Sequence, residues 1–297
     1  PLHVLLEKTS DWDKDERYMA TNDLCSILSK DQKLTEEMEK KICAAVLKQL
    51  DDPSNDVQSV AVKCLSIVLK KVNQTQIGEV CTKLCSLILD GGKDALRDIY
   101  SIALRGLITD VPDTMGTLVS DLLTSRLLSG MVRAGSDDIK RECIDNMTEL
   151  LKRFGHLNEC DHVDIMNIVT KQLEHEKAIL RKRSANCVGA LAVVSSDALL
   201  NQLVTALLDQ IALSEGKSAV HTRMLIQTIG TISRTVGYRL GRHLPRIVPL
   251  FLRFCGDASD ESQQTDEANE LRESCFPGLE SFVHTCPREV EEFLPQI

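Results

Sequence analysis

The chain has 297 residues and a formal net charge of −9, and 3% of its residues are aromatic although 43% are hydrophobic. So few aromatic side chains argue against a large β-sandwich and against a surface that stacks nucleic-acid bases, and the negative charge repels a nucleic-acid duplex. The eleven cysteines include no CxxC pair, and their odd number indicates free thiols in a reducing compartment. No apolar run approaches about 18 residues, so no membrane span is expected.

The first predicted helix begins near residue 13 and carries a motif that returns along the chain. Counted from Arg17, the offsets +3, +7, +10 and +11 are Ala20, Leu24, Ile27 and Leu28, which lie in one arc of a helix. The same offsets are mostly apolar from six later zero positions, which are Gln58, Arg97, Lys140, Arg181, Thr222 and Arg272. The intervals between zero positions are 41, 39, 43, 41, 41 and 50 residues, a period typical of HEAT and armadillo repeats.

A second helix is predicted before each later copy of the motif. Residues 35–50 carry an apolar stripe at every fourth position, with Glu36 and Glu37 in the first turn, where the helix dipole favours anions, and they stop before Pro53. Similar helices are predicted over 77–89, 117–128, 161–173, 198–213 and 244–255. This alternation leaves no room for strands. We therefore predict an all-α fold, the α-α superhelix of a HEAT-repeat solenoid.

The predicted solenoid is a single domain over residues 1–297. It has about seven repeats plus part of an eighth, with approximate bounds of 1–33, 34–73, 74–113, 114–157, 158–195, 196–241, 242–285 and 286–297. The interval of 50 comes from the polar, acidic run 256–270, which we expect to be an exposed, mobile loop in the seventh repeat. The eighth repeat stops within its first helix, near 288–294, without a polar cap, so we expect the natural protein to continue.

Acid-x-base trios at the starts of motif helices predict a charged ladder between repeats. Asp15 and Arg17, Asp138 and Lys140, and Glu270 and Arg272 form such trios. We expect each basic residue to reach the acid of an adjacent repeat. An exposed rung of this kind contributes about 0–1 kcal/mol, so apolar burial between repeats must hold the stack.

No constellation of residues for catalysis is found. GxSxG, Walker A, HExxH and GxGxxG motifs are absent, so we expect no enzyme, no cofactor and no small-molecule substrate. Cys160, Asp161 and His162, with His156 nearby, form a weak zinc candidate that lacks a partner pair, and no metal site is predicted. The basic run at 181–183 could be a nucleic-acid or localisation patch, but on an acidic chain it is interpreted as one ladder arginine with flanking solvated bases. Neither nucleic acid nor membrane is expected as a partner.

With no catalytic or metal site predicted, the surface of the helices is the remaining candidate for function. In each motif helix, the offsets +1, +5, +9 and +12 point away from the core arc. In HEAT stacks the second helix of each pair lines the concave side, so these offsets predict a continuous inner face. A merely solvated face is one interpretation. The other is that this face binds a partner protein, because an extended concave surface is what solenoids present to partners.

Several stretches match one family closely, in order and over nearly the whole chain. They are LLEKTSDWDKDERYMATNDL (5–24), DVQSVAVKCLSIVLKKV (56–72), KDALRDIYSIALRGLI (93–108), RTVGYRLGRHLPRIVPL (234–250), ELRESC (270–275) and LESFVHTCPREV (279–290). In these stretches the chain resembles the N-terminal arm of the cullin-associated, neddylation-dissociated exchange factors, an all-HEAT family. It departs from the family at 256–270, where the family's loop is usually shorter, and residues 110–160 match weakly.

The resemblance implies a protein-binding scaffold rather than an enzyme. Such a scaffold wraps the C-terminal region of unmodified cullins and their RING subunit and blocks cullin neddylation. In the full-length protein it also promotes exchange of substrate-receptor modules in the cytoplasm and nucleus. The element that displaces the adaptor is implied to lie in C-terminal repeats outside this chain. The candidate partner-binding residues on the inner face are Asn22, Lys63, Asp98, Lys182, Arg223, Gln227, Arg234 and Glu273, with Thr21 and Asp23 beside Asn22.

Three other interpretations stay open. A karyopherin-type nuclear transport receptor also stacks HEAT repeats, but its cargo grooves commonly use arrays of Trp and Asn, and this chain has only Trp12. A phosphatase scaffold subunit has repeats of more uniform length than these. In the third interpretation the solenoid is an arm of a distant enzyme, and no residue of this chain would then carry the chemistry.

Overall fold

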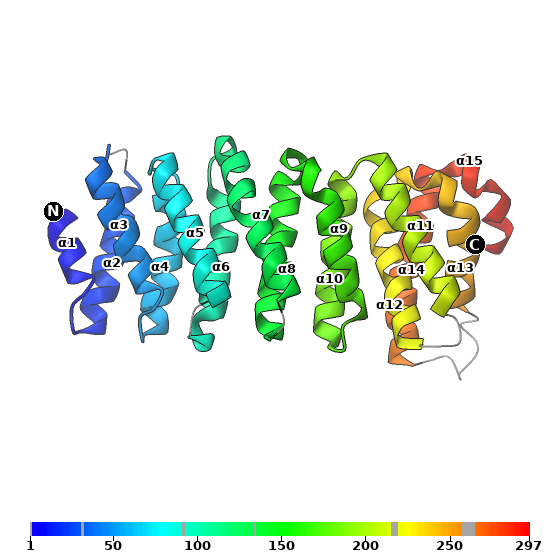
Figure 1. Cartoon of the computed structure of the whole chain (residues 1–297), viewed down its shortest axis with the longest axis horizontal. Helices are drawn as coiled ribbons and strands as arrows, with labels where there is room; N and C mark the ends of the chain where they lie inside the picture. The colour runs from blue at the N-terminus through cyan, green and yellow to red at the C-terminus, as the bar shows by residue number, and fades with distance from the viewer. Residues whose placement is uncertain (1, 31–32, 91–92, 134, 215–218, 257–264) are drawn as a thin grey trace. The chain divides into compact units, whose positions relative to one another are not determined.

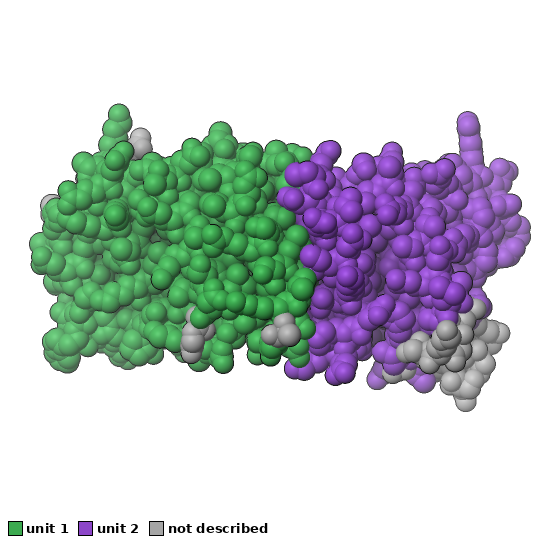
Figure 2. Space-filling view, in the orientation of Figure 1, with its two compact units in different colours: residues 1–158 green, residues 159–297 purple. Residues whose placement is uncertain are grey.

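The computed structural model of the protein describes residues 2–30, 33–90, 93–133, 135–214, 219–256 and 265–297. Within these ranges it contains fifteen α-helices, several short 3-10 helices and no strand (Figure 1). The predicted all-α fold is confirmed. The chain divides into two compact units, unit 1 over Pro1–Asn158 and unit 2 over Glu159–Ile297 (Figure 2).

From α2 onward the helices alternate along the chain as predicted, whereas the short helix α1 at the start of the chain was not predicted. Unit 1 contains α1 (Leu2–Lys8), α2 (Lys14–Leu28), α3 (Glu36–Gln49), α4 (Asn55–Val68), α5 (Gln74–Asp90), α6 (Arg97–Asp110), α7 (Gly116–Val132) and α8 (Asp137–Phe154). Unit 2 contains α9 (His162–Lys171), α10 (Ala178–Val194), α11 (Asp197–Ser214), α12 (Ala219–Val236), α13 (Leu244–Cys255), α14 (Asp266–Thr285) and α15 (Pro287–Val290). The seven predicted motif helices are the even-numbered helices α2 to α14, here called second helices.

The motif offsets form the core. All are buried except Ile27 and Val283, which are half-buried. In unit 1 each second helix packs on its own first helix and on the second helix of the next repeat, in the order α2, α4, α6 and α8. In unit 2 the same holds for α10, α12 and α14, with α12 and α14 in the closest association. The second helices therefore form one continuous layer in each unit, as the pattern of burial requires.

The helix starts follow local signals. Thr35 stands before α3, and its hydroxyl accepts the Met38 N–H at 3.3 Å, which satisfies one of the free amides of the first turn. Thr265 does the same for α14 by accepting the Ala268 N–H at 3.2 Å. Asp266–Glu270 therefore belong to a helix, and the expectation of a loop up to residue 270 is wrong there. Residues 257–264 of that predicted loop lie outside the described residues.

The predicted eighth repeat also differs in detail. Its expected first helix over 288–294 is α15, which ends at Val290 and is followed by a 3-10 helix over Glu291–Gln296. Pro295 lies inside that segment and lacks the amide that a continuing α-helix needs. The repeat bounds themselves stay predictions.

Charged side chains link neighbouring repeats, and of the three basic residues in the predicted trios Arg17 has the expected contact with an acid of the adjacent repeat. Its guanidinium donates to Asp52 of the next repeat, from Nε at 2.7 Å and from Nη2 at 3.0 Å. Three other arginines at the zero position donate to backbone carbonyls that precede their own helix, with Arg97 bound to Ile88, Arg181 to His175 and Glu176, and Arg272 to Cys255. These arginines satisfy carbonyls left over at turns between helices.

Further links come from Arg153 and Arg239, which follow the same plan in the two units. Each side chain lies at or just beyond the end of a second helix. Each donates to carbonyls at the end of the preceding second helix and to the acid that follows it, which is Asp113 for Arg153 and Asp197 for Arg239. A cation there stabilises the carbonyl end of a helix.

Candidate protein-binding site

Two adjoining cavities hollow the outward face of the second helices in unit 2. One has a volume of about 290 Å³ and the other about 370 Å³, and both lie over α12 between α10 and α14. Four residues border both cavities: Lys182, Met224, Gln227 and Glu270. We call the two cavities together the α12 groove. Its floor includes Met224, which is 6% exposed, and its rim is polar.

The α12 groove gathers five of the ten residues that the sequence analysis selected. Lys182 comes from α10, Arg223, Gln227 and Arg234 from α12, and Glu273 from α14. Each side chain stands at the offset +1, +5 or +12, on the side of its helix away from the core. Close packing of α10, α12 and α14 brings these offsets together. Contact with a partner remains a prediction for all five.

An ion pair spans the groove. The Lys182 ammonium lies 3.3 Å from Glu270 Oε1, although the two residues are 88 positions apart. The pair joins α10 to α14 across the face of α12, and both side chains are more than half exposed. Glu270 belongs to the third acid-x-base trio. Its carboxylate is thus found beside Lys182, two repeats earlier in the chain.

Among the described residues that line the groove, basic groups outnumber acidic ones. Arg181, Lys182, Arg223 and Arg234 line it, against the carboxylates of Glu270 and Glu273. Arg181 also fixes the turn before α10, because it donates to the carbonyls of His175 at 2.8 Å and Glu176 at 2.6 Å. A basic surface on a chain of net charge −9 favours contact with a partner's carboxylates.

The other five selected residues lie in unit 1, outside the α12 groove. Asn22 and Asp23 are exposed on α2, Lys63 is exposed on α4, and Asp98 on α6 is exposed beside Arg141, whose Nη2 lies 3.1 Å from its carboxylate. Thr21 is fully buried, and its hydroxyl donates to the Arg17 carbonyl at 2.8 Å. Thr21 therefore supports α2 from within, and the structure does not place it on a binding face.

Sequence reasoning missed Met224 and assigned Glu270 to a loop and a ladder. Met224 stands at offset +2, between the outward and core positions, so its share in the groove depends on how closely α10 approaches α12. A signal for Glu270 was present in the run Thr265-Asp266-Glu267. A threonine followed by two acids is a helix start, and it places Glu270 in the second turn of α14.

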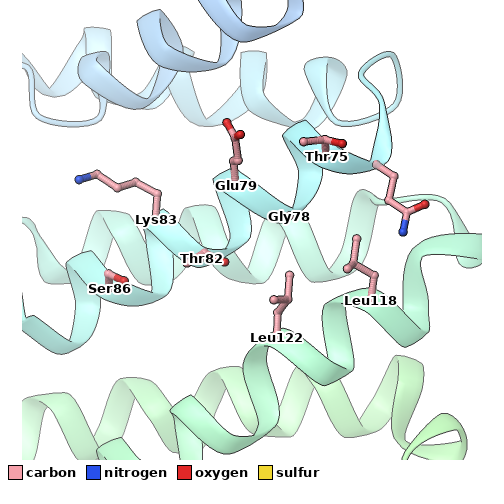
Figure 3. Close-up of a pocket in the computed structure, with 9 residues that line it drawn as sticks. Thr75, Gly78, Glu79, Thr82, Lys83, Ser86, Leu118 and Leu122 are labelled. Atoms are coloured by element: carbon pink, nitrogen blue, oxygen red, sulfur yellow. The ribbon is translucent and has the colours of Figure 1, made fainter. Parts of the chain in front are cut away.

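A larger cavity, of about 750 Å³, lies in unit 1 between the first helices α5 and α7 (Figure 3). Leu118 and Leu122 of α7 point toward α5 at Gly78, whereas Glu79 and Lys83 of α5 point away from the two leucines. None of the residues selected from the sequence lines it. The offsets that define the second helices give no information on this other layer, which is why the sequence analysis did not find the cavity.

The described parts of the chain contain no group of three or more His, Cys, Asp or Glu side chains that could hold a metal ion. Cys160, the centre of the weak zinc candidate, is exposed, and the other ten cysteines are buried free thiols. Among the helices of the described ranges, none has the length and apolar character needed to cross a membrane.

Comparison with curated proteins finds relatives over nearly the whole chain, whereas no protein-family model matches. The cullin-associated NEDD8-dissociated protein 1 of Arabidopsis thaliana is 37% identical over 287 residues, which are 96% of this chain and 23% of that protein. The cullin-associated NEDD8-dissociated protein 2 of Mus musculus is 33% identical and covers 99% of this chain and 24% of its own length. The chain thus spans about a quarter of the length of these relatives.

A shorter relative matches along most of both chains. It is named the N-terminal part of cullin-associated NEDD8-dissociated protein 1, from Emericella nidulans, and is 27% identical over 86% of this chain and 84% of its own length. Among solved structures, Kap121p bound to Pho4p has a TM-score of 0.67 over 98% of this chain and 31% of its own, at 12% identity. Importin beta has a TM-score of 0.65 over 100% of this chain and 38% of its own, at 11% identity. At such identities the likeness shows the fold, that of a HEAT-repeat solenoid.

Proposed function

The chain is a homologue of the cullin-associated NEDD8-dissociated proteins, and on this premise we propose that it is a protein-binding scaffold for the C-terminal region of unmodified cullins and for their RING subunit. The observation that carries the proposal is the 37% identity to one of these proteins over 96% of the chain. The α12 groove supports it, because a helical layer with outward charged side chains suits a folded protein partner.

The layer of second helices is well suited to hold a rigid partner. Neighbouring helices pack at about 10 Å, so each repeat places its outward side chains at a fixed distance from those of the next. Backbone positions are set by the core, and little order has to be imposed when a partner binds. In the α12 groove Lys182, Arg234 and Glu273 lie exposed at the rim, where charges select the partner and its orientation.

The finer parts of the function are proposed on the family relationship. Binding covers the cullin region that receives the ubiquitin-like modifier, so that the chain lowers the rate of neddylation. Exchange of substrate-receptor modules needs parts of the longer relatives that this chain does not match. The protein acts in both cytoplasm and nucleus.

The proposal is tested by measuring the affinity of the chain for a cullin C-terminal fragment in complex with its RING protein. Lys182→Glu and Arg234→Glu reverse charges at the rim of the α12 groove and are expected to weaken binding about tenfold each, because each reversal replaces attraction to a partner carboxylate by repulsion. Lys171→Glu is the matched control. Lys171 is exposed on α9 of the same unit and does not line the groove, so this variant is expected to bind within twofold of the wild type.

Two results would contradict the proposal. The first is an absence of binding by the wild-type chain. The second is that all three charge-reversal variants, the control included, bind the fragment with the same affinity. A neddylation assay supplies an independent readout, in which an excess of the chain is expected to slow modification of the cullin fragment.

The karyopherin interpretation rests on fold alone. Kap121p shares the architecture at 12% identity, whereas the cullin-associated relatives share 33% to 37% of residues over nearly the whole chain. No described feature of the α12 groove favours cargo transport over cullin binding.

A further inference from the structure

The Lys182–Glu270 ion pair divides the α12 groove. Both residues border both cavities, as do Met224 and Gln227 of α12. The two charged atoms are 3.3 Å apart, and the pair crosses from α10 to α14 above α12. Separation of the two side chains would join the cavities into one channel along α12, with Met224 and Gln227 in its floor.

The pair is built so that it can open. Lys182 and Glu270 keep 57% and 54% of their side-chain surface in contact with solvent. An exposed ion pair of this kind contributes little to stability, because solvent screens it and because two long side chains must be held still. Both side chains can therefore turn away without disturbing the buried core of α10, α12 and α14.

Charge decides what can replace Glu270. Among the residues that the structure describes, four basic side chains line the groove against two carboxylates, and one of these carboxylates neutralises Lys182. When Glu270 leaves, Lys182 needs another acceptor, and Arg234 lies along the same channel. A peptide segment with two or three carboxylates offers acceptors to both Lys182 and Arg234. A nucleic-acid strand also carries anions, but the chain as a whole has a formal net charge of −9, which repels a long polyanion.

We propose that the Lys182–Glu270 pair is a latch over the α12 groove, and that the groove binds an acidic segment of the partner protein whose carboxylate displaces Glu270 from Lys182. The identity of the partner rests on the proposed cullin function. The latch and the preference for an acidic segment rest only on the groove. Glu270 acts as an internal competitor that lowers the affinity for weakly acidic segments and lets strongly acidic ones in.

The test uses fluorescein-labelled hexaglutamate as the probe and fluorescence anisotropy as the measurement. Glu270→Gln removes the competing charge and is expected to tighten binding about two- to fivefold, the range that an exposed ion pair supplies. Lys182→Gln removes the cation and is expected to weaken binding by a similar factor. Both effects should shrink as salt is raised from 50 to 500 mM, because the Debye screening length falls to about 4 Å at the higher concentration.

Glu280→Gln is the matched control. Glu280 is an exposed acid of the same helix α14, ten residues and so about 15 Å beyond Glu270, and it does not line the groove. Glu280→Gln removes the same net charge as Glu270→Gln. If the two variants tighten binding equally, the effect is one of overall charge and the latch is overturned. Circular dichroism confirms that each variant is folded.

Other outcomes also decide the matter. If hexaglutamate binds neither the wild type nor Glu270→Gln, or if a (dT)6 oligonucleotide binds more tightly than hexaglutamate, the preference for an acidic peptide is wrong. The same variants are then measured with the cullin–RING fragment. Failure of that fragment to bind, with the latch effect intact on hexaglutamate, overturns the proposed function alone. If the fragment binds but Glu270→Gln tightens the binding of neither the fragment nor hexaglutamate, this inference alone is overturned.

Discussion

Arg17 holds Asp52 through two hydrogen bonds, from Nε at 2.7 Å and from Nη2 at 3.0 Å, and so ties α2 to the turn that precedes α4. The Arg17 side chain is 13% exposed and the Asp52 side chain is 7% exposed. The same guanidinium also donates through Nη1 to the carbonyls of Asp11 and Trp12, each at 3.0 Å. One side chain thus joins the turn before α2, the helix itself and the next repeat.

We expect Asp52→Asn to destabilise unit 1 more than the loss of an exposed ion pair would. The variant keeps the shape of the side chain but loses a charge-assisted pair, which costs about 1.5–3 kcal/mol of unfolding free energy. Glu16→Gln is the control, because Glu16 pairs with Lys8 while both side chains are 50% exposed, and it should cost about 1 kcal/mol or less. Urea unfolding followed by circular dichroism measures both, and equal costs would contradict the distinction.

The same link should be sensitive to acid. Burial of the Asp52 carboxylate favours its neutral form, but the hydrogen bonds from Arg17 and from the Ser54 N–H outweigh burial, so the pKa of Asp52 lies below its ordinary value. A depressed pKa contributes stability that is fully present above the unfolded value of about 3.9 and is lost as the pH falls through the folded value. The difference in unfolding free energy between wild type and Asp52→Asn should stay constant between pH 6 and 8 and shrink below about pH 4.

Arg239→Met should weaken the link between two repeats of unit 2. Arg239 donates to the Ala192 carbonyl at 2.9 Å and to Asp197 at 2.8 Å, so methionine would leave carbonyls at the end of α10 without a donor, at a cost of about 1.5–3 kcal/mol. Arg133→Met is the comparison, since Arg133 and Asp90 are 57% and 63% exposed, and it should cost about 1 kcal/mol or less. Hydrogen exchange at the end of α10 should accelerate in Arg239→Met. Unchanged exchange there would argue against the link.

A methyl group added at Gly230 should be poorly tolerated, whereas one added at Gly78 should be accepted. A Cβ at Gly230 of α12 would lie 2.5 Å from the backbone carbonyl oxygen of Ser274 in α14, which cannot move without shifting that helix. A Cβ at Gly78 of α5 would meet Leu122 and Leu118 at 3.6 and 3.9 Å, which is ordinary contact. We expect Gly230→Ala to cost about 1–3 kcal/mol, as overpacking does, and Gly78→Ala to gain about 0.5–1 kcal/mol from helix propensity.

Thermal unfolding of the two alanine variants checks this pair of predictions. The melting temperature should fall for Gly230→Ala and rise slightly for Gly78→Ala. If Gly230→Ala were as stable as the wild type, α12 and α14 could not approach each other as closely as described.

Thiol labelling should distinguish one cysteine from the other ten. Cys160 is exposed, whereas burial raises the pKa of Cys43 and Cys81 to about 12 and that of Cys85 to about 11. Hydrogen bonds with Cys64 and Cys275 lower the pKa of Cys25 and Cys255, but burial keeps a reagent away from these two sulfurs as well. Native protein at pH 7.5 should therefore react with a thiol reagent at one site quickly and at the others only after unfolding. Cys160→Ser should remove the fast phase. Several fast sites in that variant would contradict the buried packing of the remaining thiols.

The sequence alone predicted the helices that follow α1 and the buried face of each second helix. Burial within one helix follows a period of about 3.6 residues, so the offsets from Arg17 to Arg272 identify a core without knowledge of any neighbour. The offsets +1, +5 and +12 from the same zero positions selected Lys182, Arg223, Gln227, Arg234 and Glu273 as outward residues, and all five line the α12 groove. The cullin-associated relatives added the class of partner that we propose.

Only the tertiary structure decided which outward residues lie together. Lys182 and Glu270 are 88 residues apart and meet because α10, α12 and α14 stack closely, a distance that depends on small residues such as Gly230 rather than on any local pattern. The burial of Thr21 and the links made by Arg153 and Arg239 depend on packing between helices in the same way. Helix periodicity is a local property of the chain, whereas the spacing between repeats is set by all the side chains packed between them.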